Sequence, residues 1–325
     1  MARIACVMMQ KNEDDFLEPW LAYHSYLFGI ENLYVFDNGS TMASVTETLH
    51  KFRQAGAWID EEHKEPQDFE NKGEILRLKI NEIFAGTNYD VIFPMDCDEY
   101  LAACGNNGLS SSREDISKSL EKVAIGPAAV IKINKMMYNI PGLLNQYYCN
   151  THHKVFFRRG PVVHLEMGFH NGGVVSGLVE RSSMMTYLHF HNRPHQSMLR
   201  QSKEKLKSRV DVDDIEKLRD YKGHGDHLIR NFFLSEDEYV DRFNGLQVIN
   251  FDGFYRTLCC LGADQGILRA STTQNGRLPV VGGEISAKFD TEAYLEANPD
   301  VLSSGIPAIL HYLLHGRSEG RPLKR

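Results

Sequence analysis

The sequence contains no apolar stretch long enough to span a membrane and no excess of positive charge. No window of its 325 residues approaches the roughly 18 consecutive apolar residues of a membrane-spanning helix. The N-terminal segment reaches acidic residues after too short an apolar stretch for a signal peptide. The net charge is −7, so the broad positive field that attracts nucleic acid is missing. We therefore expect a cytoplasmic protein without a nucleic-acid partner; contact with the inner face of the membrane stays open.

Cysteine pairs of the kind that bind metals or staple small secreted folds are also missing. The six cysteines include no Cys-x-x-Cys spacing, and two of them, Cys259 and Cys260, are adjacent, which favours reduced thiols. Hydrophobic residues make up 42% of the chain and charged residues 24%, and these values are typical of a globular protein. At this length we expect one large α/β domain with a small appendage.

Apolar runs alternate with helical patterns along the N-terminal third of the chain. Short apolar runs bounded by polar residues predict strands, whereas apolar residues that recur every three or four positions predict amphipathic helices. Their alternation is typical of a mostly parallel sheet with helices on both faces. The predicted strands are residues 3–9, 32–36, 58–59 and 91–95, and the predicted helices are residues 15–27, 46–55 and 72–84.

The rest of the chain shows a looser pattern. The whole chain divides into three predicted parts. A helix is predicted after the serines at 110–112 and a long charged helix at 196–221, with strands at 129–133 and 155–157. Residues 262–283 are rich in Gly and Thr and resemble a linker, and two short helices are predicted after it. The predicted parts are a catalytic domain (residues 1–260), a linker (residues 261–285) and a C-terminal helical module (residues 286–325).

Polar clusters follow three of the predicted strands. They lie at residues 10–13, 37–40 and 96–99. Ligands of parallel α/β sheets bind beyond the carboxyl ends of the strands. We therefore expect the three clusters to meet at one binding edge.

The last of these clusters contains two carboxylates separated by one residue, Asp96 and Asp98. Burying both is unfavourable unless positive charge neutralises them. Oxygen ligands favour Mg²⁺ or Mn²⁺, which commonly bind a nucleotide diphosphate as well. The pattern therefore predicts a divalent metal at Asp96 and Asp98, which would stabilise charge on a departing nucleoside diphosphate.

Four motifs in this order resemble bacterial glycosyltransferases of the family 2 type and the related family 92. The family shows a Lys-Asn-Glu loop, a Glu-x-Trp-x-x-Tyr-His helix, a Tyr-Asp-Asn-x-Ser loop and an Asp-x-Asp-Glu-Phe type motif. This chain has Lys-Asn-Glu at 11–13, the helix motif at 18–24, Phe-Asp-Asn-Gly-Ser at 36–40 and Asp-Cys-Asp-Glu-Tyr at 96–100. The resemblance covers residues 3–101 well and residues 150–205 more loosely.

The resemblance implies a GT-A fold, which is Rossmann-like, and assigns roles to the motif residues. The first two loops would hold the nucleoside, through Asn12, Glu13, Asp37 and Asn38. Asp98 would bind the metal, and Asp96 would face the ribose or the ion. From their helical spacing, Trp20, Tyr23 and His24 are expected to pack in the core.

The second half of the chain supplies further candidates by the same resemblance. The segment Tyr-Leu-His-Phe-His-Asn-Arg at 187–193 is similar to the family's His-Tyr-x-x-Arg-Ser segment, with Pro194 where serine is usual. It implies that His189 is a metal ligand. Lys154 would meet a phosphate or an acceptor hydroxyl, and His170 also has a counterpart in the family. An inverting transfer needs a carboxylate base, for which Glu166 stands at the expected chain distance.

These observations predict a metal-dependent, inverting glycosyltransferase that uses a nucleoside-diphosphate sugar, with UDP as the expected nucleotide. The expected acceptor is a glycan or a lipid-linked glycan in bacterial surface polysaccharide synthesis. The tail from Tyr294 to Arg321 resembles a short module found on bacterial cell-surface glycan enzymes. Two alternatives remain: a catalytically silent protein that binds nucleotide or glycan, and a metal-dependent nucleotidyltransferase or phosphohydrolase.

Overall fold

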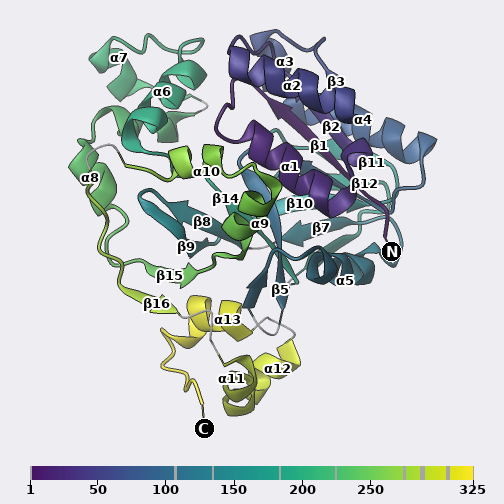
Figure 1. The fold of residues 1–325 in the computed structure, drawn as a ribbon, viewed down its shortest axis with the longest axis vertical. Helices are drawn as coiled ribbons and strands as arrows, with labels where there is room; N and C mark the ends of the chain where they lie inside the picture. Colours follow the sequence, from purple (N-terminus) through teal and green to yellow (C-terminus); the bar gives the residue numbers. More distant parts are fainter. Residues whose placement is uncertain are drawn as a thin grey trace.

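The computed structural model shows a mixed α/β protein with two seven-stranded sheets (Figure 1). It describes residues 2–105, 108–133, 135–182, 184–223, 225–273, 276–285, 290–304 and 308–324. The sequence predicted the first sheet in large part. It did not predict the second.

The first sheet has the strand order β13-β7-β10-β4-β1-β2-β3. The four strands β1, β2, β3 and β4 are parallel neighbours, as predicted. The strand β10 runs antiparallel to both β4 and β7, while β13 is parallel to β7. The bounds are β1 (Ile4–Gln10), β2 (Leu33–Asp37), β3 (Trp58–Asp60), β4 (Val91–Met95), β7 (Val130–Ile133), β10 (Lys154–Arg158) and β13 (Val179–Ser182).

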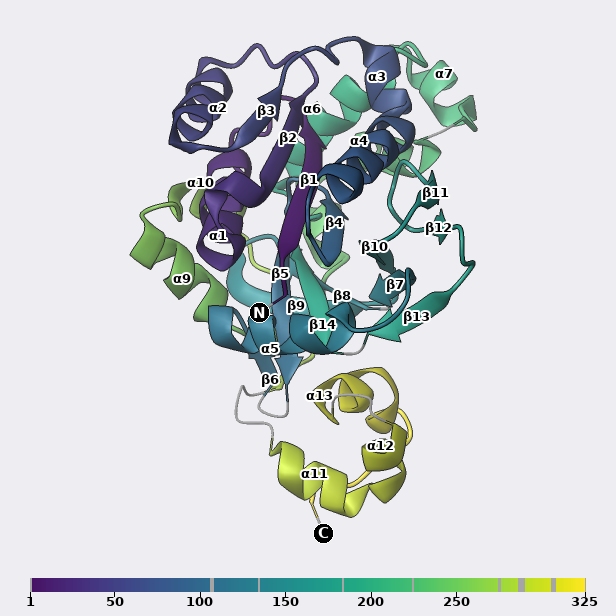
Figure 2. The same cartoon turned by 90° about the vertical axis from the view of Figure 1, so that its right-hand side faces the viewer.

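Helices cover both faces of this sheet, and every residue of β1 is therefore buried. Alternate residues of a strand point to opposite faces. Cys6 and Met8 pack in one apolar cluster with α1 (Leu17–Phe28), whereas Val7 and Met9 pack in another with α4 (Lys72–Gly86). Figure 2 shows α1 and α2 (Ala43–Ala55) on one side of β1, and α4 on the other. A further short helix, α3 (Pro66–Glu70), precedes α4.

The second sheet has the order β16-β15-β9-β8-β14-β5-β6 and is mostly antiparallel. Its strand β5 begins at Glu99, inside the acidic motif, and pairs with β14 so that His189 lies opposite Glu99. This pairing brings the late histidine next to the acidic motif. The bounds are β5 (Glu99–Gly105), β6 (Gly108–Ser110), β8 (Met136–Ile140), β9 (Leu143–Asn150), β14 (Met185–His189), β15 (Gln247–Asn250) and β16 (Gly283–Ile285).

The predicted long helix at 196–221 is wrong, because the chain forms two helices there. These are α6 (His195–Leu206) and α7 (Ile215–Asp220). The Asp214 side chain accepts hydrogen bonds from the backbone N–H groups of Glu216 and Lys217, so it caps the start of α7. Asp211, Asp213 and Asp214 therefore lie at or before a helix start and not within a helix.

The stretch expected to be a linker also contains a helix, α10 (Gln265–Ala270), which follows α9 (Gly253–Leu261). Ile267 is fully buried in the main apolar cluster. Arg269 forms a 2.8 Å ion pair with Asp15, beside the start of α1. Residues 265–270 thus pack on the main domain.

The remaining elements surround these sheets. The two-stranded hairpin of β11 (Val162–Leu165) and β12 (Gly172–Val174) packs against α4. Ser112 caps α5 (Arg113–Ala124) as predicted. The other short elements are the 3₁₀ helices at Ile30–Asn32 and Asp226–Phe232, and α8 (Glu236–Asp241).

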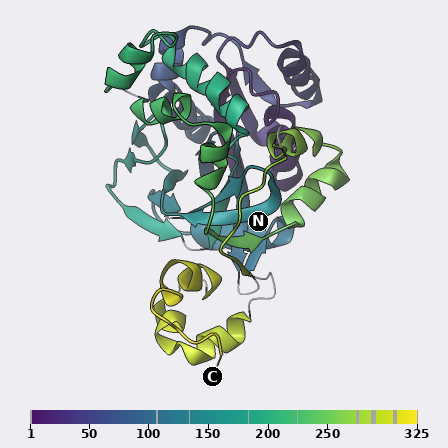
Figure 3. The same cartoon turned by 90° about the vertical axis from the view of Figure 1, so that its left-hand side faces the viewer.

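The C-terminal tail forms a small body of short helices with its own buried side chains. It contains α11 (Thr291–Ala297), α12 (Pro299–Ser304) and α13 (Ala308–His311), followed by a π-helical turn at Tyr312–Gly316. The sequence predicted two helices here, whereas the described residues form three. Residues 305–307, part of the turn expected between the two, lie outside the described residues. All three views place the tail at the end of the molecule opposite the carboxyl ends of β1 and β2 (Figures 1–3).

Over the described part of the chain, no helix combines the length and apolar character that crossing a bilayer requires. All six cysteines are free. Trp20, Tyr23 and His24 are buried in α1, which confirms the prediction that they pack in the core.

The buried ring of His24 makes the fold sensitive to acid. Its Nδ1 lies 2.9 Å from the carbonyl oxygen of Trp20, and its ring stacks on that of Tyr100. Burial lowers the pKa of His24 to about 3, although the hydrogen bond to Trp20 opposes the shift. The unfolded chain therefore binds a proton between about pH 6.5 and pH 3 that the folded chain does not.

We expect His24→Phe to reduce the loss of stability between pH 7 and pH 4.5, because phenylalanine fills the ring site without taking up a proton. The contribution of neutral His24 is complete above pH 6.5 and falls by at most about 3 kcal/mol at pH 4.5. Urea unfolding at both pH values measures it, with the exposed His50→Gln as control. Equal pH dependence in wild type and His24→Phe would contradict the assignment.

Candidate active site

The three polar loops meet where the strand order of the first sheet reverses. From β1 the chain proceeds through β2 to β3, and then returns to place β4 on the other side of β1. Such a reversal opens a crevice at the carboxyl ends of the two central strands, where ligands of this type of sheet bind. The loop at 11–16 follows β1 and the loop at 96–98 follows β4, so they flank this crevice.

The loops after β1 and β2 are joined into one unit by hydrogen bonds. The Asp37 carboxylate is 4% exposed and accepts hydrogen bonds from Gln10 Nε2 at 2.5 Å and from the Ser40 backbone N at 2.9 Å. Asn12 adopts a left-handed φ of 54°, and its Oδ1 accepts a hydrogen bond from the backbone N of Thr41 at 2.8 Å. These side chains therefore hold the two loops together. Direct contact of Asn12 and Asp37 with a nucleotide stays a prediction.

Asn38 connects the same unit to the segment before α3. Its Nδ2 donates hydrogen bonds to the carbonyl oxygens of His63 and Glu65, at 2.7 Å and 2.9 Å. Its side chain is almost completely buried. In this structure Asn38 fixes the loop, and its predicted nucleotide contact stays untested.

Asp96 is held by two lysines, one from each side. Its Oδ1 lies 2.8 Å from Lys72 Nζ, and its Oδ2 lies 2.7 Å from Lys154 Nζ. Lys154 also lies 2.9 Å from Glu99 Oε1, and Glu99 is fully buried. Burial raises the pKa of Asp96, but Lys154 and then Lys72 outweigh it and hold this pKa well below its usual range. Both oxygens of Asp96 thus have cationic partners from the chain itself.

Asp98 has different partners and faces His189. Its Oδ1 lies 3.3 Å from His189 Nε2, and its Oδ2 lies 3.7 Å from Arg193 Nη2. The same Arg193 nitrogen lies 2.7 Å from Glu13 Oε2. Burial raises the pKa of Asp98, but His189 and Arg193 lower it well below the usual value. The structure therefore brings Glu13, Asp98, His189 and Arg193 together from three separate parts of the chain.

A divalent cation would find two protein ligands here, Asp98 and His189. Over the described residues, no three His, Cys, Asp or Glu side chains are arranged as a complete metal site. Mg²⁺ usually takes one or two carboxylates from the protein and fills its shell with waters and substrate phosphates. The arrangement suits an ion that arrives with a diphosphate better than an ion bound alone. Metal binding, including the predicted role of Asp96 as a ligand, remains a prediction.

Histidine and tyrosine rings form a wall beside Asp98. The Tyr138 hydroxyl lies 2.9 Å from His152 Nδ1, and its ring packs edge-on against His189 at 4.8 Å between centroids. His191 packs on the same tyrosine, and burial lowers its pKa to about 3. His170 Nδ1 lies 2.7 Å from the carbonyl oxygen of His153. At neutral pH the His191 ring is therefore uncharged.

The predicted base, Glu166, lies in the turn between β11 and β12. Its Oε2 accepts a hydrogen bond from Asn171 Nδ2 at 3.2 Å. The described contacts do not join it to Asp96 or Asp98, so its catalytic role stays a prediction.

Sequence reasoning missed Lys72 and Gln201 as site residues. Lys72 is the first residue of α4, a helix whose start returns to the carboxyl edge of the sheet. Gln201 lies on α6 and donates to Glu13 Oε1 at 3.2 Å. The helical pattern at 72–84 predicted that a helix starts at Lys72, and this position was the one sign in the sequence that Lys72 lies near the site.

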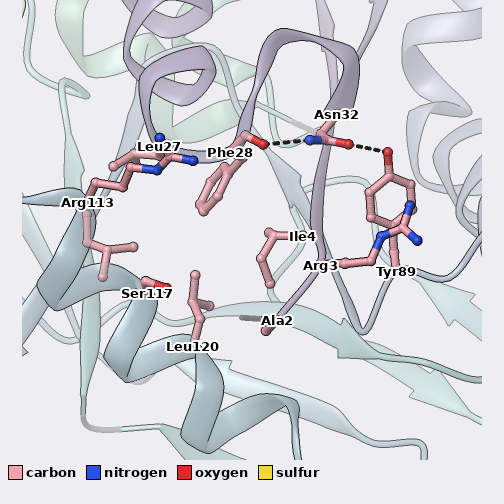
Figure 4. A pocket seen from close by; sticks show the side chains of 11 residues that line it. Ala2, Arg3, Ile4, Leu27, Phe28, Asn32, Tyr89, Arg113, Ser117 and Leu120 are labelled. Carbon is pink, nitrogen blue, oxygen red and sulfur yellow. Dashed lines mark hydrogen bonds between the residues drawn. The ribbon is translucent and has the colours of Figure 1, made fainter.

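A cavity of about 230 Å³ lies away from this site, at the amino end of β1 (Figure 4). Its lining includes Arg3, Ile4, Phe28, Tyr89 and Arg113. Because the acidic motif lies at the carboxyl ends of the strands, this cavity is not part of the candidate active site.

No protein-family model matches the chain, and no curated protein matches it. Among solved structures, the chain is similar to S. aureus TarS 1-349 with a TM-score of 0.36 and 10% identity, covering 99% of this chain and 92% of that one. The same protein in complex with UDP gives a TM-score of 0.35, with the same identity and coverage. Scores this low assign neither fold nor function.

Proposed function

We propose that the protein is a metal-dependent, inverting glycosyltransferase that uses a nucleoside-diphosphate sugar, with UDP as the nucleotide. The acceptor we propose is a glycan or lipid-linked glycan of bacterial surface polysaccharide synthesis. One observation carries this proposal. Loops that are far apart in the sequence and resemble glycosyltransferase motifs converge at the strand-order reversal, together with His189 and Arg193.

The proposed donor site uses the loops after β1 and β2 for the nucleoside and the acidic motif for the diphosphate. Asp98 and His189 would hold the metal, which would offset negative charge on the departing diphosphate. Lys72 and Lys154 keep Asp96 ionised and fixed. The wall of Tyr138 and neighbouring histidines would exclude water from one side of the sugar.

The proposed transfer is a single displacement. The acceptor oxygen forms a bond to the anomeric carbon, and the bond from that carbon to the phosphate oxygen breaks. The diphosphate leaves with the electron pair, and the acceptor proton passes to a carboxylate. We assign this base to Glu166, in the turn that Asn171 holds.

A thermal-shift panel of UDP-, GDP-, CDP- and dTDP-sugars, each with and without Mn²⁺, tests the proposed donor class. We expect Mn²⁺ with a UDP-sugar to raise the melting temperature more than either component alone. A ligand at 100 times its Kd stabilises the folded state by about 2.7 kcal/mol. If none of the nucleotides raised the melting temperature in Mn²⁺, the proposal would be wrong.

A binding protein without catalytic activity is the second candidate, because both oxygens of Asp96 are already paired with lysines. It predicts the same thermal shifts but no release of UDP over time. Slow, Mn²⁺-dependent hydrolysis of the UDP-sugar would exclude it. A nucleotidyltransferase is less well supported, since enzymes of that kind usually have a Gly-rich loop after the first strand, and here that loop is Gln-Lys-Asn-Glu.

A further inference from the structure

Helix α6 lies near the carboxyl edge of the first sheet (Figure 2), and two ion pairs that flank the helix join it to the loop after β1 and to α3. Just before the helix, Arg193 pairs with Glu13 of the loop after β1. Just after it, Arg209 pairs with Glu70, the last residue of α3. Glu70 stands two residues before Lys72, the partner of Asp96. Figure 2 shows α6 near the upper ends of β1 and β2.

One face of α6 is turned toward the loop after β1. Gln201, on this face, donates to Glu13 Oε1 at 3.2 Å. Lys205 follows four residues later, and residues four apart lie on the same side of a helix. Lys205 therefore extends from the same side of α6 as a side chain that already contacts the site.

Lys205 also differs from the other lysines of this segment in its partners. Lys203 lies 3.6 Å from Asp213, and Lys207 lies 2.5 Å from Glu204. All three side chains are exposed. Within the described residues, no carboxylate lies at ion-pair distance from Lys205. Its charge is thus available for a ligand.

The charges that act on Lys205 are those of the candidate site. Burial among surrounding protein atoms lowers the pKa of Lys205, Glu13 raises it, Arg193 lowers it, and Asp98 and Asp96 raise it. Together with the contact of Gln201 with Glu13, these charges indicate that Lys205 lies on the side of α6 that faces the candidate site.

We propose that Lys205 binds a phosphate oxygen of the donor's diphosphate. This inference rests on the proposed function and adds to it a residue of α6. Asp96 and Asp98 already have cationic partners, so an oxyanion that enters the crevice meets Lys205 as a cation that no carboxylate engages. A flexible lysine is suited to binding a phosphate as a point charge.

The test compares the affinities of UDP and uridine for four proteins in the presence of Mn²⁺, by calorimetry. The proteins are wild type, Lys205→Gln, Lys205→Arg and the control Lys203→Gln, which removes the same charge from the same helix. We expect Lys205→Gln to weaken UDP binding about tenfold, as for the loss of one charge-assisted hydrogen bond. Uridine binding and the melting temperature should stay unchanged.

Lys205→Arg should retain most of the UDP affinity, and Lys203→Gln should remain within about twofold of wild type. Equal UDP affinity in Lys205→Gln and wild type would overturn the role of Lys205 alone. Equal weakening of UDP and uridine would also overturn it, because the effect would then not involve the diphosphate. If wild type did not bind UDP in the presence of Mn²⁺, the proposed function itself would be wrong.

Discussion

Replacement of Asp98 by asparagine should lower Mn²⁺-dependent release of UDP from a UDP-sugar by about 10³-fold. Asp98 is the carboxylate that faces His189 at 3.3 Å, and both of its described partners could turn toward an ion or a phosphate. Asparagine keeps the size of the side chain but removes the negative charge that would hold a metal. Loss of one group that stabilises transition-state charge typically lowers kcat by about 10²–10³-fold, and loss of the metal adds to this.

The control for Asp98→Asn is Asp213→Asn, the same change at an exposed position before α7. Arg193 keeps its contact with Glu13 in the Asp98 variant, so we expect both variants to fold. UDP should still bind to Asp98→Asn in the absence of Mn²⁺, but Mn²⁺ should no longer strengthen that binding. An Asp98→Asn variant with wild-type turnover would show that the site works without this carboxylate.

The first sheet was predictable because its signals are local. Each strand of β1–β4 is a short apolar run that ends in polar residues, and each helix between them has an apolar stripe. The alternation of Cys6 and Met8 with Val7 and Met9 between two apolar clusters is the direct result of this pattern. The position of the polar loops at one edge follows from parallel order alone.

The second sheet was not predictable because its pairings join distant segments. The pair β5 and β14 sets His189 opposite Glu99, a register that depends on tertiary packing and leaves no trace in the spacing of either strand. The sequence resemblance identified His189 as a candidate metal ligand but gave no information on its position in the fold. The missed break between α6 and α7 is different, since Asp214 is a residue type that favours helix starts.

The sequence alone did not show which positive groups neutralise the acidic motif. Two carboxylates separated by one residue, Asp96 and Asp98, imply a positive partner but do not identify it. Lys72 and Lys154 come from α4 and β10, and both reach Asp96. The chain therefore neutralises Asp96 with its own cations, so the metal that we propose would be held by Asp98 and the substrate.

Removal of Lys154 should have the largest effect on stability. Its side chain is 3% exposed and lies between Asp96 and Glu99. Burial lowers the pKa of Lys154, but Asp96 and Glu99 outweigh it and raise this pKa above its usual range, so the lysine is charged in the folded protein. Lys154→Met would leave the fully buried Glu99 without its partner. Breaking a buried ion pair from one side costs about 3–5 kcal/mol, which corresponds to a fall in melting temperature on the order of 10 °C.

A double variant separates the contribution of the ion pair to stability from that of the packing of the Lys154 side chain. In Lys154→Met with Glu99→Gln, no unpaired charge stays buried, and Lys72 still holds Asp96. We therefore expect the double variant to be more stable than Lys154→Met alone, with a coupling energy of about 2 kcal/mol in urea unfolding.

The exposed pair of Lys118 and Glu114 gives the matched control, because Lys118→Met should change stability by less than about 1 kcal/mol. Equal losses for Lys154→Met and Lys118→Met would mean that Lys154 does not neutralise the buried carboxylates.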